Sequence, residues 1–122
     1  MLGVAAARFG AVEMSFLLVP MLLSGVLFDV AFTLVRRALA GERVIEAHRG
    51  HLYQVAARSG MDARLVAMLH WGFAALGGIV AIAFVYAPSP VKPLLPPLLL
   101  VPQLVWLGYV TAIARRARLE RW

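Results

Sequence analysis

The sequence predicts an all-α, polytopic integral membrane protein with three transmembrane helices, a short N-terminal apolar helix and one cytoplasmic polar loop. Its 122 residues are 62% hydrophobic with a mean hydropathy of +0.84, which is far too apolar for a water-soluble domain. Apolar runs of about 20 residues, the length that crosses the hydrocarbon core of a bilayer, recur along it. The charged residues are concentrated between and after these runs, so we expect a single membrane domain over residues 1–122.

The first two elements differ in how well they fit a membrane span. Residues 2–12 are apolar but interrupted by Arg8 and too short to cross, so we expect an interfacial helix or an incomplete span. Residues 15–35 are long enough to cross and contain one acid, Asp29, two turns before Arg36. We predict that residues 15–35 form the first transmembrane helix.

Residues 65–87 and 94–114 are the other two predicted transmembrane helices. In the first of them, Gly72, Gly77 and Gly78 supply small positions that permit close helix packing. The second contains three prolines, which remove backbone donors and favour a kink or a late helix start: Pro96, Pro97 and Pro102.

Residues 36–64 form the extended polar segment and are the predicted cytoplasmic loop. Gly41 and Gly50 punctuate it, as residues that end helices and form turns do. We therefore expect a helix end near Leu39, a loop through Gly50 and a short helix over residues 51–58.

The basic residues predict the orientation and the partners. Six arginines lie in residues 36–64 and four follow Ala114, whereas the one basic residue in residues 88–93 is Lys92. Because Lys and Arg in short loops stay on the cytoplasmic side, the polar loop and the C-terminus are expected inside a bacterial inner membrane. The net charge of +6 then favours membrane lipids with anionic headgroups as partners, rather than nucleic acid.

The polar loop contains the first group of candidate binding residues. His48 and His51 are three apart, but Glu46 is spaced to face away from them and the chain has no cysteine, so the pattern disfavours a metal site. Arg49 between two histidines suits phosphate, because guanidinium grips two oxygens and imidazole donates a further hydrogen bond. A basic loop held against anionic lipid explains the same spacing.

Asp29 is the second candidate. At helical spacing, Asp29, Thr33, Arg36 and Arg37 share one side of the expected first span. An acid at membrane depth is costly and usually faces a polar cavity or a partner, although an interfacial acid among headgroups would look the same. The six scattered acids form no cluster able to hold Mg²⁺, so the pattern predicts no catalytic residue and no metal ligand in this chain.

The order of features from Pro20 to Gln54 resembles a known family. The residues concerned are Pro20, Asp29, Val30, Thr33, Arg36, Arg37, Gly41, Glu42, Arg43 and the run His48-Arg49-Gly50-His51-Leu52-Tyr53-Gln54. They look like the C-terminal part of the polyprenyl-phosphate N-acetylhexosamine-1-phosphate transferases, glycosyl transferase family 4. Those enzymes are polytopic inner-membrane proteins that use Mg²⁺ to move a sugar-1-phosphate from a UDP-sugar to a polyprenyl phosphate in cell-envelope polysaccharide synthesis.

The resemblance assigns roles within the loop. Arg49 and His51 fall on the Arg and first His of the family's D-R-x-H-x-H-H motif, while His48, Tyr53 and Gln54 replace its Asp and its second and third His. It implies that Arg49 and His51 contact diphosphate, with His48 beside them and Tyr53 stacking on the base. Asp29 and Arg36 would shape the cytosolic mouth.

The resemblance covers about the last third of such an enzyme. The family's aspartate-rich motifs have no counterpart here, so the ligands for Mg²⁺ are not in this chain. We therefore expect the C-terminal third of a larger transferase, inactive as an isolated chain and in need of other transmembrane helices. One alternative is a non-enzymatic small membrane protein that acts as a helix-packing or lipid-surface partner. A small multidrug-type transporter fits the size, but it would need an acid deeper in a span than Asp29.

Overall fold

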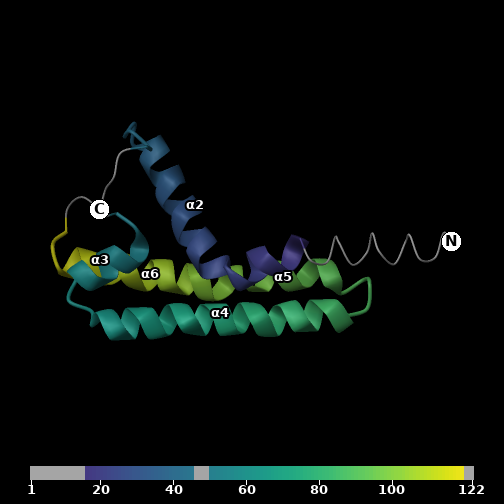
Figure 1. Cartoon of the computed structure of the whole chain (residues 1–122). Helices are drawn as coiled ribbons and strands as arrows, with labels where there is room; N and C mark the ends of the chain where they lie inside the picture. The colour runs from purple at the N-terminus through teal and green to yellow at the C-terminus, as the bar shows by residue number, and fades with distance from the viewer. Residues whose placement is uncertain (1–15, 46–49, 120–122) are drawn as a thin grey trace.

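The computed structural model describes residues 16–45 and 50–119, and the regular structure within them is helical (Figure 1). Helices α4 (Ala63–Tyr86) and α6 (Leu100–Arg116) lie side by side and antiparallel. The chain between them turns through a 3-10 helix, η1 (Lys92–Leu94), and the short helix α5 (Leu95–Leu98).

Two further helices place the candidate residues. Helix α2 (Ser24–Leu39) rises away from the α4/α6 pair at a steep angle, and α3 (Leu52–Arg58) lies where α4 begins and α6 ends (Figure 1). The α3 helix contacts both α4 and α6. The expected helix over residues 2–12 lies outside the described residues.

Two helical stretches are long and apolar enough to cross a membrane. These are Ala63–Tyr86, with 24 residues, and Lys92–Arg116, with 25. They confirm apolar helices at the predicted 65–87 and 94–114, each slightly longer than expected. The second stretch is interrupted at Leu99, between Pro97 and Pro102. Proline has no backbone N–H to donate and its ring clashes with the preceding turn, which accounts for a break at this place.

The helix expected over residues 15–35 is broken rather than continuous. The structure has two helices, Phe16–Leu22 and Ser24–Leu39, bent by 77° at Leu23, and the second runs past Val35 to Leu39. Pro20 lies before the break and Ser24 with Gly25 after it, which are residues at which helices kink. The chain therefore has two candidate spans, or three if the bent pair crosses as one.

The bend is packed against α4 at two glycines. A Cβ on Gly77 would overlap the carbonyl oxygen of Met21 and lie 3.2 Å from Cα of Leu22. A Cβ on Gly25 would lie 3.1 Å from Cβ of Phe73. Close packing was expected at Gly77, and the structure shows it where the bend meets α4.

Both ends of the polar segment follow the sequence prediction. At the end of α2, Gly41 adopts a φ of +71°, Glu42 N–H donates to Arg37 O at 3.0 Å and Gly41 N–H donates to Ala38 O at 3.2 Å. This is a Schellman motif, in which a left-handed glycine lets the last carbonyls find donors. The short helix expected over residues 51–58 is α3, Leu52–Arg58.

The buried side chains form two clusters at opposite ends of the α4/α6 pair. One joins α3 to α4 and α6 through Leu52, Val55, Ala56, Val66, Trp106, Val110 and Ala114. The other joins the bend to α4 and the turn before α6 through Met21, Ala81, Phe84 and Leu99. The first cluster anchors α3, which presents the candidate residues.

Candidate functional site

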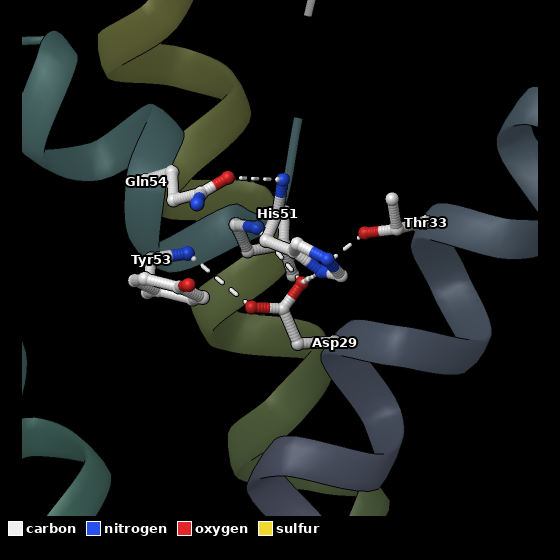
Figure 2. A network of polar contacts seen from close by, with 6 residues as sticks. Asp29, Thr33, His51, Tyr53 and Gln54 are labelled. Carbon is white, nitrogen blue, oxygen red and sulfur yellow. Dashed lines mark hydrogen bonds and ion pairs between the residues drawn. The ribbon is translucent and has the colours of Figure 1, made fainter. Parts of the chain in front are cut away.

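The candidate site is built around the carboxylate of Asp29, which is 3% exposed (Figure 2). Asp29 Oδ1 accepts hydrogen bonds from Leu52 N–H at 2.8 Å and from the Thr33 hydroxyl at 3.2 Å. Oδ2 accepts from Tyr53 N–H at 3.3 Å. A side chain of α2 thus satisfies the first amides of α3, where the partial positive charge of the helix also favours an anion.

Residues 51–54 complete the start of α3. His51 N–H donates to Gln54 Oε1 at 3.4 Å, and His51 Nδ1 lies 3.4 Å from Asp29 Oδ1 (Figure 2). The backbone amides that open the helix therefore have acceptors from Asp29 and Gln54. As a result, the side chains of His51 and Tyr53 are held next to α2.

Aromatic rings continue the site across three helices. The His51 and Tyr53 rings stack with their centroids 5.9 Å apart. The Tyr53 ring and the ring of His70, on α4, meet edge to face with their centroids 6.2 Å apart. His70 also meets Trp106 of α6, at 5.8 Å. Such offset and edge-to-face pairs are favourable arrangements of aromatic rings.

A hollow of about 230 Å³ opens among these residues and is lined by Val26, Asp29, Val30, His51, Tyr53 and His70. A larger groove of about 600 Å³ runs between α3 and α4 and is also lined by Val26, Tyr53 and His70. The groove is otherwise largely apolar, with Gln54 and Arg58 among its walls. The arrangement provides a small chamber lined by four polar side chains and two valines, next to a wider apolar groove.

His70 is the site residue whose place the sequence did not indicate. It is hydrogen-bonded within its helix, with Nδ1 2.9 Å from Val66 O. A carbonyl accepts and does not donate, so Nδ1 carries the hydrogen and Nε2 is left for a ligand. The polar loop and the acid in the first apolar run supplied the other candidates, whereas His70 lies in an apolar helix 17 residues after Tyr53, where no local motif marks it.

The structure brings together Asp29, His51 and Tyr53, but not Arg36. Arg36 is half-buried on α2 and is not among the residues that line either hollow. His48 and Arg49 lie outside the described residues. The four remaining candidates therefore divide into three that share one hollow and one that lies apart from it.

Arg37, rather than Arg36, is buried on the same side of α2 as Asp29, at 4% exposure. Its Nε lies 3.1 Å from Glu42 Oε2, and its Nη1 donates to Val44 O at 3.3 Å. These contacts fold the segment after α2 back onto the helix. Arg37 thus has a structural role that the sequence did not assign.

Metal binding receives no support from the described residues, which contain no group of three His, Asp or Glu side chains able to hold an ion. The hollow offers one carboxylate, and that carboxylate already accepts three hydrogen bonds from protein donors. What the site offers a ligand is the imidazoles of His51 and His70 and the phenol ring of Tyr53, a set suited to hydrogen bonding and stacking.

The chain was compared with known proteins in three ways. No protein-family model matches it, and neither a curated protein nor a solved structure matches its sequence or fold.

Proposed function

We propose that this chain is the C-terminal membrane part of a glycosyl transferase family 4 enzyme, which moves a sugar-1-phosphate from a UDP-sugar to a polyprenyl phosphate. In this proposal Arg49 and His51 bind the diphosphate, Tyr53 stacks on the base and His48 adds a further donor. Arginine and imidazole offset phosphate charge in the bound state and in the transition state.

One observation carries the proposal: Asp29, His51 and Tyr53 line one hollow although they come from two helices. The resemblance linked these residues through sequence order alone. Their convergence supports a shared ligand, and the buried cap by Asp29 keeps residues 51–53 next to it. Asp29 then acts by positioning the loop, and Arg36 by adding positive charge nearby.

The proposal includes partners. Mg²⁺ would be held by carboxylates of other polypeptide, because this sequence lacks aspartate-rich motifs. Further transmembrane helices would pack against α2, whose Val26, Leu27 and Leu34 are exposed. The loop and the C-terminus would lie in the cytoplasm beneath a bacterial inner membrane.

Binding of UDP-N-acetylglucosamine to the reconstituted full chain tests the proposal. We expect Arg49→Ala and His51→Ala each to weaken binding about tenfold, because each removes a charge-assisted or polar contact to phosphate. Arg115→Ala is the matched control, since it removes the same charge from the end of α6 and lines neither hollow. Circular dichroism checks that the variants fold. Unchanged affinity in both loop variants would refute the assignment.

A second candidate function is a small membrane protein that acts as a helix-packing or lipid-surface partner without a reaction of its own. The observation that favours it is that the Asp29 carboxylate is satisfied within the chain. The genomic DNA ahead of the Met1 codon separates the two. An in-frame region encoding aspartate-rich loops supports the transferase, whereas a ribosome-binding site after unrelated sequence supports the packing partner.

A further inference from the structure

A further cavity, of about 350 Å³, lies at the bend between Phe16–Leu22 and α2. Both halves of the bent helix line it, together with α5 and the start of α6. Nine of its lining residues are apolar and two are polar, Ser24 and Gln103. It shares no lining residue with the hollow around Asp29.

Gln103 is unusual for its position. It lies near the middle of the candidate span Lys92–Arg116 and is 2% exposed, yet its Oε1 accepts no hydrogen bond from the described residues. Ser24 Oγ, on α2, is also buried without a partner there. A buried polar atom without a partner is costly, most of all in hydrocarbon, where water does not compensate.

The burial of Gln103 limits what its partner is. Its own chain covers almost all of this side chain. The indole of Trp106, one turn further along α6, does not line this cavity. A partner therefore enters through the cavity that Gln103 lines.

We propose that this cavity binds a neutral membrane amphiphile, an apolar chain that ends in a hydroxyl group. The apolar walls match a hydrocarbon chain, and the cavity is about ten times the volume of one water molecule. No lining residue is charged, so a carboxylate or phosphate would lose its hydration without compensation. A hydroxyl both donates and accepts, which matches Gln103 Oε1 and Ser24 Oγ after rotation of their terminal torsions.

Photo-crosslinking tests this proposal. The full chain is reconstituted in lipid with a diazirine-bearing derivative of 1-decanol, or with the same probe lacking the hydroxyl, and labelled peptides are mapped by mass spectrometry. We expect the alcohol to label residues 17–31 and 96–103 about tenfold more than the alkane does, the difference that one buried hydrogen bond makes.

Two variants make the test specific. Gln103→Leu keeps the volume and removes one of the two polar groups, so the preference for the alcohol probe should fall. Thr111→Val is the matched control, because it removes a hydroxyl from the same helix at a site outside the cavity, where Thr111 Oγ1 donates to Leu107 O. It should keep the preference for the alcohol. Equal labelling of the parent chain by both probes, or an undiminished preference in Gln103→Leu, would overturn the proposal.

Discussion

Asp29 and Asp62 both accept hydrogen bonds at the start of a helix, but in different settings. Asp62 precedes its own helix, α4, and accepts from Arg64 N–H at 2.7 Å at an exposed position. Asp29 belongs to α2 and caps α3, 23 residues away in sequence, at a buried position. The local cap helps one helix to begin, whereas the remote cap also fixes where α3 lies.

Replacing Asp29 by Asn should therefore loosen α3. Asn has one acceptor oxygen, and its NH₂ group would face the amides of Leu52 and Tyr53, so we expect a loss of about 2 kcal/mol in the free energy of unfolding. Hydrogen exchange should become faster at the Leu52 and Tyr53 amides. Both quantities are measured on the reconstituted chain, by denaturant titration and by exchange with mass-spectrometric detection.

Asp62→Asn is the matched control for that change. Asp and Asn cap exposed helices about equally well, so we expect the free energy of unfolding to fall by less than about 0.5 kcal/mol. If the two variants lost the same stability, or if exchange at Leu52 and Tyr53 stayed slow in Asp29→Asn, the remote cap would not hold α3 in place.

Residue-level reasoning from the sequence reached part of this site. It singled out Asp29, His51 and Tyr53, because an acid in an apolar run and a His-Arg-Gly-His loop stand out in composition. It grouped Arg36 and Arg37 with Asp29 by helical spacing. The structure instead buries the row Gly25, Asp29, Thr33 and Arg37, spaced by four. Contacts between helices follow such inclined rows, which the spacing alone did not distinguish.

At the scale of elements, the bend at Leu23 depends on the close approach of Met21 to Gly77. We expect Gly77→Ala to destabilise the chain by about 2 to 3 kcal/mol, because the new methyl group would overlap a backbone oxygen that cannot rotate away. The measurement is the free energy of unfolding, with the distance between spin labels on Phe16–Leu22 and α4 as a second readout.

Gly72→Ala provides the opposite expectation in the same helix. A Cβ there meets nothing within 4 Å, so alanine should stabilise α4 by about 0.5 to 1 kcal/mol through lower backbone entropy in the unfolded chain. Similar effects of both substitutions would mean that Gly77 does not hold the bend.

The helix ends were predictable and the bend was not, for a physical reason. Gly41 determines the end of α2 through its own backbone conformation, and Gly60 ends α3 with a φ of +98° in the same way. Hydropathy gives the length of an apolar run but not its straightness. The bend needs residues near 21 to meet residue 77, which no local pattern in residues 15–35 encodes.

At the scale of the whole molecule, the two ends of the α4/α6 pair differ in charge. The end near α3 contains Arg58, Arg64, Arg115 and Arg116, all exposed, whereas the turn at the other end contains Lys92. Because Lys and Arg are retained in the cytoplasm, the arginine-rich end should lie inside. In that orientation the hollow around Asp29 and His51 opens near the inner surface, where a nucleotide-sugar is available.

Cysteine labelling tests this orientation without background, because the chain contains no cysteine. Ser89→Cys lies in the turn between the two spans, and Ala117→Cys follows α6; both positions are exposed. In intact spheroplasts an impermeant maleimide should label Ser89→Cys at once and Ala117→Cys only after the membrane is permeabilised. The reverse pattern would place the hollow on the outer side, away from cytoplasmic UDP-sugars, and the transferase proposal would fail even if the helices span as described.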